Sequence, residues 1–566
     1  MAASDLGRQL VELEACRFAF GPGAAARVVR LLKQLDSRDL PDPATLIRFH
    51  ETLLFLRAFP QGPAVVRAAE RILNRFHTKV EASRKNGVDM DDFDTFEVSG
   101  IAGTEMEDTL SFDVARWLVG RMPGKLKIAW ENYEPGRELG NTGPRFIPLL
   151  EDDAYVEADT PCREWLEAAG GKNSSTPEWL ISRFEDLPLP SQQKAELYES
   201  LRVPLRWKLE NSTITRTRNL EPVRNIFYHS KPLISRSQVS LATELARRPP
   251  TLKKLSRRAG EQIIELIHEV MLVRYRELYG TTLGDPKSVF QADVGRGVTI
   301  YLWNLPPDRR LPLRAYVAGL TLKNGVPINY IEAIGLCEWI EVGFNTFYSF
   351  RGGEAGWIYA QVLRCLSHLM GTTCISVYPY QLGKDNDEAI ESGAFWFYRK
   401  LGFRPGRADL RELVEREEKK IAADPKYRTP ARTLQRLASE HVFYELPGSE
   451  VGAWDRFSTR NIGLRVNRQM AREFARDAVR MREHSTPKLE RMLDVKTSAW
   501  KSLDKAAFEI FALVLQQVPG LGDWNREEKE ALLRVIRAKA KPDEMLYLHL
   551  TQRHHRLRQA LLKLGS

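Results

Sequence analysis

The chain has 566 residues and a formal net charge of +10, and its composition is 43% hydrophobic and 28% charged. This length exceeds what a single hydrophobic core supports, so we expect two to four domains. The balance of apolar and charged residues excludes an intrinsically disordered chain. No stretch reaches the roughly 18 uninterrupted apolar residues of a membrane span.

The N-terminus lacks the basic and then apolar run of a signal peptide, which favours a cytoplasmic protein. The five cysteines are odd in number and widely spaced, and they form no CxxC pair or Cys/His cluster. This pattern indicates reduced thiols and argues against a metal site.

The charge is distributed unevenly along the chain. Residues 460–566 contain 22 lysines and arginines but only 13 acidic residues, whereas residues 89–113 are strongly acidic. Such asymmetry indicates either a polyanionic partner or a contact between these two regions.

The first two segments differ in pattern. Residues 1–86 carry apolar groups at helical spacing between prolines, which predicts a small helical domain. Residues 87–220 form a mixed α/β segment whose fold the pattern leaves open. We expect a helix at 110–119, a strand at 125–130, a long loop at 135–148 and a strand pair at 205–217.

Residues 221–446 give the clearest pattern, which is that of an α/β protein with a mixed sheet. Asn324-Gly325 is a hairpin signal between two of its strands. In chain order we expect a strand at 223–228, an amphipathic helix at 259–279, strands at 298–303 and 313–322, a long strand at 328–347, with or without a bulge, a helix at 356–370 capped by Gly371, a strand at 372–378, a helix at 389–401, an extended piece at 403–405, a charged helical insert at about 409–438 and a strand at 441–446.

Residues 455–566 are again helical in pattern. We expect one helix from 464 to 482, with five arginines along one face because their spacing is three or four residues. Phosphate binding, a solvated face, and docking onto the acidic 89–113 segment all account for this stripe, and we favour the internal contact over nucleic acid. The arginines are Arg465, Arg468, Arg472, Arg476 and Arg480.

Residues 394–403 read Ala-Phe-Trp-Phe-Tyr-Arg-Lys-Leu-Gly-Phe, an aromatic helix that ends at a glycine. This stretch resembles the FYxKLGF signature of the GNAT superfamily of N-acyltransferases, which use acyl-coenzyme A. The predicted order of elements also resembles a GNAT domain over roughly residues 221–446. The resemblance implies a GNAT-like acyltransferase fold, flanked here by helical N-terminal and C-terminal domains.

Residues 349–356 form a glycine-rich turn that leads directly into the predicted helix at 356–370. Backbone N–H groups at a helix N-terminus attract anions, and glycines let a phosphate approach closely. Arg351 and Gly356 match the family pattern Arg/Gln-x-x-Gly-x-Gly/Ala, whereas Glu354 stands where a glycine belongs. The alternative is an ordinary strand-to-helix turn.

By resemblance, the turn would hold the pyrophosphate of acetyl-CoA or another acyl-CoA, and the preceding strand would offer backbone groups to the pantetheine arm. The residues implied are Phe344, Asn345, Thr346, Arg351, Gly352, Gly353, Glu354, Ala355 and Gly356.

Tyr398 matches the family's general acid, which protonates the departing thiolate. The alternative is a core aromatic residue. For a general base we favour Glu338 or Glu341 on the long predicted strand. These two have opposite parity, so an unbulged strand would point them to opposite faces.

These observations predict an enzyme that moves an acyl group, most simply acetyl, from acyl-CoA to an amine of unidentified class. The alternative is a non-catalytic binding or scaffold protein with a degenerate acyltransferase domain that contacts protein or nucleic acid. A carboxylate at Glu354 favours the scaffold, and the intact 398–403 signature favours the enzyme.

Overall fold

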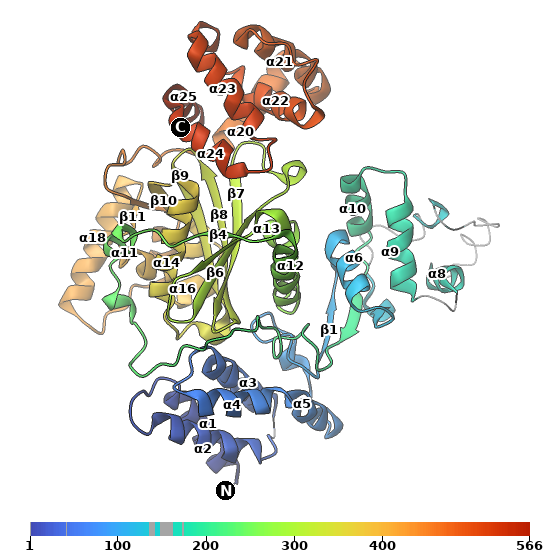
Figure 1. Ribbon diagram of the computed structural model, residues 1–566, viewed down its shortest axis with the longest axis vertical. Coiled ribbons are helices and arrows are strands. Elements are labelled where there is room, and N and C mark those ends of the chain that lie inside the picture. The colour runs from blue at the N-terminus through green and yellow to red at the C-terminus, as the bar shows by residue number, and fades with distance from the viewer. Residues whose placement is uncertain (1, 41, 135–141, 146, 148–161, 172–174) are drawn as a thin grey trace. The chain divides into compact units, whose positions relative to one another are not determined.

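The computed structural model describes residues 2–40, 42–134, 142–145, 147, 162–171 and 175–566 (Figure 1). The chain divides into two compact units. Unit 1 contains Met1–Pro232, Glu265–Thr282 and Asn324–Pro327, and unit 2 contains Leu233–Ile264, Leu283–Lys323 and Ile328–Ser566. The C-terminal helices therefore belong to the same unit as the large sheet.

Unit 1 begins with the helices expected in residues 1–86. They are α1 (Ala2–Cys16), α2 (Ala24–Asp36), α3 (Pro43–Ala58), α4 (Pro63–Leu73) and α5 (Phe76–Lys85). Helix α3 shows why a helix starts here: the Asp42 carboxylate accepts a hydrogen bond from the Thr45 backbone N–H at 2.8 Å, and Pro43 occupies the first helical position.

Unit 1 also contains a three-stranded antiparallel sheet in the order β1-β3-β2. Its strands are β1 (Glu105–Asp108), β2 (Leu126–Ile128) and β3 (Leu205–Lys208), and helices α6 (Phe112–Arg121), α8 (Cys162–Gly170), α9 (Thr176–Asp186) and α10 (Ser191–Ser200) accompany them. The strand pair expected at 205–217 is wrong, because only β3 forms. The chain then turns, and the Arg216 backbone N–H bonds to the Gly100 carbonyl. The loop expected at 135–148 lies mostly outside the described residues.

Acidic side chains of the 89–113 segment have partners within unit 1, as two examples show. Glu107 accepts hydrogen bonds from Arg206, and Asp94 accepts one from the Tyr275 hydroxyl. The expected contact of this segment with the arginines of unit 2 stays a prediction.

Unit 2 is built on a mixed nine-stranded sheet in the order β11-β12-β10-β9-β8-β7-β6-β5-β4. The strands are β4 (Lys253–Lys254), β5 (Phe290–Asp293), β6 (Val298–Asn304), β7 (Ala315–Lys323), β8 (Val326–Leu336), β9 (Trp339–Thr346), β10 (Cys374–Val377), β11 (Arg404–Pro405) and β12 (Val442–Glu445). Strands β9 and β10 run parallel, while their other neighbours β8 and β12 are antiparallel to them.

The long strand expected at 328–347 is instead a hairpin of β8 and β9. The chain reverses at Cys337, whose φ of 51° lies in the left-handed region. Cysteine is not a turn residue and apolar groups continue on both sides, so the sequence carries no signal for this turn.

Two further expectations are wrong. No strand forms at 223–228, because the Phe227 backbone N–H and C=O both bond to the side chain of Asn324. The helix expected at 389–401 is two short helices, α16 (Asp387–Glu391) and α17 (Ala394–Arg399), which are separated at Gly393 with a φ of 66°.

Helix α14 (Ala355–Met370) connects β9 to β10 and packs on the sheet (Figure 1). The ring of Tyr359 in α14 lies 4.8 Å from that of Phe344 in β9, and Gly371 caps the helix with a φ of 65°. The other helices before the C-terminal region are α11 (Leu241–Ala246), α12 (Arg257–Leu272), α13 (Tyr279–Thr282), α15 (Pro379–Leu382), α18 (Ala408–Ala423) and α19 (Ala431–Leu437), so the insert expected at 409–438 is helical.

The C-terminal helices are α20 (Thr459–Glu473), α21 (Ala478–Leu493), α22 (Ser502–Leu515), α23 (Arg526–Ala538), α24 (Glu544–Arg553) and α25 (His555–Gly565). The single helix expected at 464–482 is wrong. The chain breaks between α20 and α21, where Ala475 and Arg476 have φ angles of 51° and 69°. The five arginines therefore do not share one helical face.

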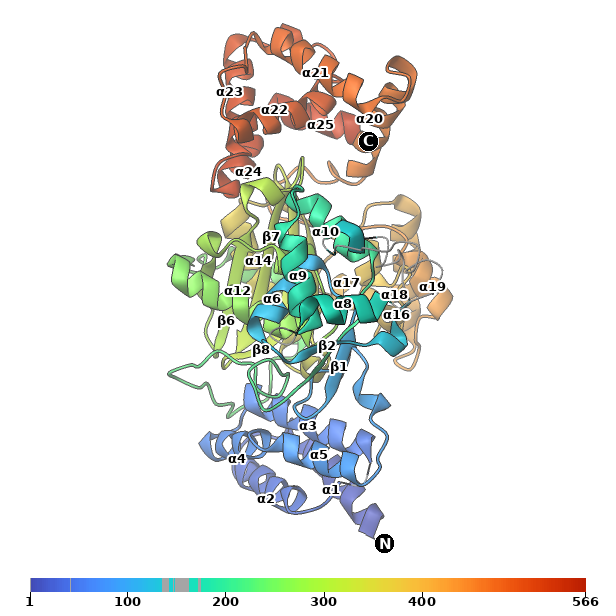
Figure 2. The ribbon, with the colours of Figure 1, turned by 90° about the vertical axis from the view of Figure 1, so that its right-hand side faces the viewer.

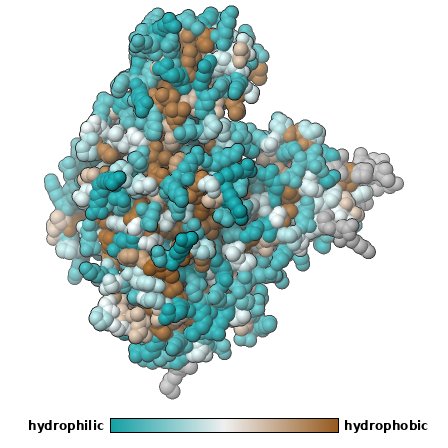
Figure 3. All heavy atoms as spheres, in the orientation of Figure 1, coloured by the Kyte–Doolittle hydropathy of each residue, from teal (hydrophilic) through white to brown (hydrophobic). Residues whose placement is uncertain are grey.

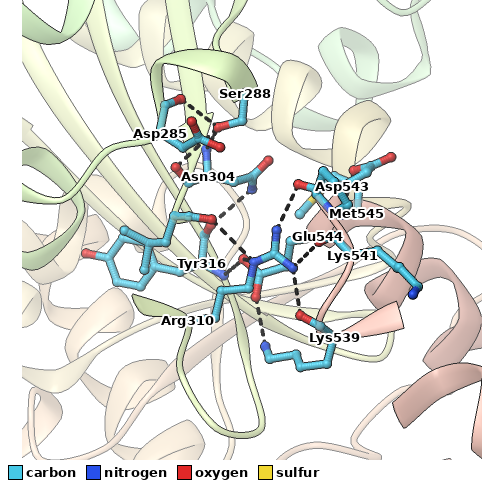
Figure 4. Close-up of polar contacts among 12 residues, drawn as sticks. Asp285, Ser288, Asn304, Arg310, Tyr316, Lys539, Lys541, Asp543, Glu544 and Met545 are labelled. Carbon is cyan, nitrogen blue, oxygen red and sulfur yellow. Dashed lines mark hydrogen bonds and ion pairs between the residues drawn. The ribbon is translucent and has the colours of Figure 1, made fainter. Parts of the chain in front are cut away.

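A buried polar cluster joins α24 to the sheet, and Figures 1 and 2 both show this helix beside β7. The Arg310 guanidinium donates to the backbone carbonyls of Lys539 at 2.7 Å and Pro542 at 2.8 Å (Figure 4). The Lys539 ammonium donates to the fully buried Glu544 carboxylate at 2.7 Å. These buried polar groups meet one another's hydrogen-bonding needs, so the cluster has a structural role: it is a joint between α24 and the sheet.

The face in Figure 3 is mostly hydrophilic, with apolar side chains in small groups. Within the described residues, no helix has the length and apolar character needed to cross a membrane. The same residues contain no group of three or more His, Cys, Asp or Glu side chains that could hold a metal ion.

Candidate functional site

The two parallel strands β9 and β10 separate part-way along their length. They are paired from Trp339–Cys374 to Glu341–Ser376, whereas β9 continues to Thr346 and stays paired with β8 over its whole length. The Glu338 carbonyl accepts from the Cys374 N–H, so even-numbered residues of β9 direct their backbone groups toward β10. Beyond the Glu341–Ser376 pair, the backbone groups of Phe344 and Thr346 thus point to the side of β9 from which β10 has diverged.

The glycine-rich turn follows β9 and ends at the N-terminus of α14. The first helical residue is Ala355, and the first backbone N–H that bonds back into the helix is that of Ile358, to the Glu354 carbonyl at 2.9 Å. Among the described residues, no side chain caps the N-terminus of this helix. The N–H groups of Ala355, Gly356 and Trp357 accordingly stand at the helix terminus, the place where anions bind.

Glu354 does not direct its charge at this helix terminus. Its side chain is fully buried, accepts a hydrogen bond from the Ile234 N–H at 3.0 Å, and forms ion pairs with Arg296 and with Lys323 at 3.8 Å. Burial alone would raise the pKa of Glu354, but the hydrogen bonds from Arg296 and Ile234 and the charge of Lys323 outweigh it and lower this pKa. The carboxylate is a structural anchor of the turn.

Lys323 is a cation near the turn whose pKa is strongly lowered. Its side chain is fully buried at the end of β7, and its ammonium donates to the Arg296 carbonyl. Burial lowers the pKa of Lys323 to about 7, although the Glu354 carboxylate partly opposes this shift. The turn is thus anchored by the buried Glu354 and Lys323 together with the partly exposed Arg296.

Segment 233–239 crosses beside the N-terminus of α14. A Cβ added at Gly356 would lie 3.2 Å from the Arg236 side chain and 3.3 Å from its Cα. Only a residue without a side chain fits this contact comfortably, which explains the glycine. Burial lowers the pKa of Arg236.

Arg351, the other residue that matches the family pattern, lies at the surface. Its guanidinium pairs with Glu388 at 2.5 Å and lies over the ring of Tyr348. The Arg351 side chain is therefore held at the surface of the turn by Glu388 and Tyr348.

Tyr398 lies in an aromatic cluster and is 4% exposed. Its ring is 5.7 Å from that of Tyr359 and 5.8 Å from that of Phe403. Burial raises the pKa of Tyr398 above its usual value, so the phenol keeps its proton at neutral pH. A protonated phenol can donate to a thiolate, and the packing also fits the alternative of a core aromatic residue.

The two candidate carboxylates have different environments. Glu338 lies in the hairpin turn and not on a strand, and its carboxylate accepts from Arg558 at 2.7 Å and from the Trp454 indole at 2.8 Å. Glu341 lies on β9 at the last residue that pairs with β10. Its carboxylate faces the His441 imidazole, with 2.7 Å between Oε2 and Nε2. The structure therefore leaves Glu338 in a structural role and brings Glu341 to the point where the strands separate.

His441 is the residue that the sequence analysis missed. It stands alone immediately before β12, without metal-ligand spacing or a motif, so no sequence signal distinguishes it from a surface histidine. Only the register of β9, β10 and β12 brings it to Glu341.

The described cysteines with resolved surroundings offer no reactive thiolate. Cys16, Cys337, Cys365 and Cys374 are free and buried, and burial raises the pKa of Cys365 to about 12, so this thiol is not ionised at neutral pH.

The structure brings most of the predicted residues into one region: Phe344, the turn at 351–356 and Tyr398 all adjoin α14. No family model, no curated protein and no solved structure matches the chain.

Proposed function

We propose that unit 2 is a GNAT-type N-acyltransferase that transfers an acyl group, most simply acetyl, from acyl-CoA to an amine. One observation carries the proposal. A parallel strand pair stops pairing part-way, and a glycine-rich turn joins its first strand to a helix with uncapped N–H groups. This arrangement resembles the acyl-CoA site of the GNAT superfamily, and the 394–403 signature lies beside it.

Each part of the proposed site has a chemical role. The N–H groups at the start of α14 would bind the pyrophosphate, because the helix dipole and the unpaired donors both favour an anion. The backbone of Phe344 and Thr346 would bind the pantetheine amides where β10 has left. Tyr398 would protonate the departing sulfur.

Thermal denaturation with acetyl-CoA tests this proposal. A ligand that binds only the folded protein raises the melting temperature by mass action, and we expect a clear rise at about 1 mM acetyl-CoA. No rise at that concentration contradicts the proposal.

A matched pair of variants locates the site. Ala355→Asp places a carboxylate at the first residue of α14, where it suits the helix dipole but repels a phosphate. We expect this variant to fold normally and to lose the acetyl-CoA shift. Ala431→Asp makes the same change at the first residue of α19 and should keep the full shift.

A non-catalytic scaffold is the second candidate, and segment 233–239 favours it. Arg236 already packs against Gly356, and the Ile234 N–H ties the same segment to Glu354. A turn held in this way can be purely structural. An unchanged melting temperature with acetyl-CoA, together with unchanged stability in Ala355→Asp, would support the scaffold.

A further inference from the structure

We propose that His441 and Glu341 form a general-base dyad, in which His441 takes the proton from the acceptor amine and Glu341 orients the imidazole. This inference rests on the proposed acyl transfer and adds a catalytic residue to it. The dyad is assembled from two segments about 100 residues apart in the chain.

The dyad lies at the end of the pairing between β9 and β10. Glu341 pairs with Ser376 in the last pair between β9 and β10, and His441 precedes Val442, which pairs with Val377. Both side chains therefore lie where the two parallel strands begin to separate. Ligands of sheets with parallel strands bind where such strands part at their carboxyl ends.

The contact with Glu341 fixes which nitrogen of His441 carries the hydrogen. An ionised carboxylate only accepts, so the His441 Nε2 carries the hydrogen in the 2.7 Å contact, and Nδ1 keeps its lone pair when the ring is neutral. Within the described residues, no group hydrogen-bonds to Nδ1. The carboxylate then stabilises the imidazolium that proton uptake produces.

The exposure and the charged neighbours of the dyad suit proton transfer. The side chains of His441 and Glu341 are 26% and 15% exposed, so the pair is held in place yet open to solvent. Arg314 lies 3.7 Å from Glu341, and the neighbouring Glu440 pairs with Arg407 at 3.6 Å. Among the residues that the structure describes, Glu341 is therefore the one carboxylate in direct contact with the imidazole.

An aromatic ring beside the dyad fits a cationic acceptor. Tyr378 follows β10, is 51% exposed, and lies edge-to-face with the His441 ring at 5.4 Å. The face of an exposed tyrosine attracts an ammonium group, which is the state of a primary amine at neutral pH. The acceptor class that this site fits is thus a primary ammonium.

In the proposed step, the acceptor ammonium gives one proton to Nδ1 of His441, which passes it to water. The amine lone pair then attacks the thioester carbonyl carbon, so that a C–N bond forms and the C–S bond breaks. The sulfur takes a proton from Tyr398, and the second proton of the nitrogen restores the phenol.

Kinetics over a range of pH test the catalytic role. The probe reaction is acetyl transfer from acetyl-CoA to spermidine or to a lysine-containing peptide with a free N-terminus. We expect His441→Gln to lower kcat/KM about 10²-fold at pH 7 while the acetyl-CoA melting shift is kept. The loss should shrink by pH 9.5, because more of the amine is already unprotonated there. His555→Gln, at an exposed histidine, is the control and should not change the rate.

Chemical labelling tests the dyad independently of turnover. Diethyl pyrocarbonate reacts with imidazole nitrogens, so its reaction rate at His441, measured by peptide mass spectrometry, reports how accessible the ring is. Glu341→Ala removes the carboxylate that holds Nε2, and the freed ring should be labelled several-fold faster at pH 7. An unchanged labelling rate would overturn the dyad.

The outcomes separate the two proposals. If the wild-type protein neither binds acetyl-CoA nor transfers its acetyl group, the proposed function fails and the catalytic role of His441 fails with it. If the wild-type protein binds and transfers while His441→Gln is equally active, or is reduced by the same factor at every pH, the dyad alone is overturned.

Discussion

Lys323→Met removes the buried ammonium beneath the turn and should make the protein more stable at neutral pH. The pKa of Lys323 is about 7 in the folded protein, against the usual 10.5. At 1.36 kcal/mol per pKa unit, holding the charged form in the fold costs roughly 5 kcal/mol below pH 7. The hydrogen bond from Lys323 to the Arg296 carbonyl offsets about 1 kcal/mol of this cost. We therefore expect a net gain of about 4 kcal/mol.

The stability gain of Lys323→Met should depend on pH. Between pH 7 and 10.5 the unfolded chain binds a proton at Lys323 that the folded protein has released, so wild-type stability rises with pH. The advantage of Lys323→Met should be complete at and below pH 7 and should disappear as the pH approaches 10.5.

The assay is thermal melting of wild type and Lys323→Met at several pH values between 6 and 10. Lys287→Met, at an exposed lysine of the same unit, is the control and should follow the wild-type curve. The competing view is that the contact of Lys323 with Glu354 dominates. Breaking a buried ion pair would then destabilise the protein by about 3–5 kcal/mol at pH 7. A lower melting temperature for Lys323→Met at pH 7, or curves that run parallel over the whole range, would refute the reasoning.

Three further predictions concern the candidate site, the ion pairs that support its turn, and the joint at α24. Glu354→Gln should lower the melting temperature at pH 7, because Arg296 and Lys323 lose their carboxylate, and it should not tighten acetyl-CoA binding; tighter binding at unchanged stability would show that the carboxylate crowds the phosphates. Tyr398→Phe should keep the fold and the acetyl-CoA melting shift but lower acetyl transfer by roughly 10²-fold, and an unchanged rate would leave Tyr398 as a packing residue. Arg310→Met should accelerate hydrogen exchange in residues 539–548, because the backbone carbonyls that it binds lose their donor, and unchanged exchange there would contradict its role as a joint.

Much of the local structure follows from patterns that the sequence states directly. Helix α14 and its cap at Gly371, the Asn324-Gly325 hairpin and the helical flanks all follow from apolar periodicity and turn chemistry, which act over a few residues. The glycine-rich turn and the aromatic stretch at 394–403 could likewise be recognised from the sequence alone.

Local patterns failed where distant groups decide the conformation. The side chain of Asn324 takes hydrogen bonds of Phe227 that a strand at 223–228 would need. Cys337 adopts a left-handed backbone conformation, although cysteine is not a typical turn residue. The predicted arginine stripe breaks at Ala475 and Arg476, although its spacing suits a single helix.

The chemistry of the candidate site was decided by tertiary structure. The sequence determined that Glu354 stands at the start of α14, but its ion pairs with Arg296 and the buried Lys323 decide that its charge turns away from the helix terminus. The sequence also offered Glu338 and Glu341 as equivalents. Strand register decides between them, because it brings Glu341 to His441, a residue 100 positions away, and hydrogen-bonded contacts over such separations leave no mark in local periodicity.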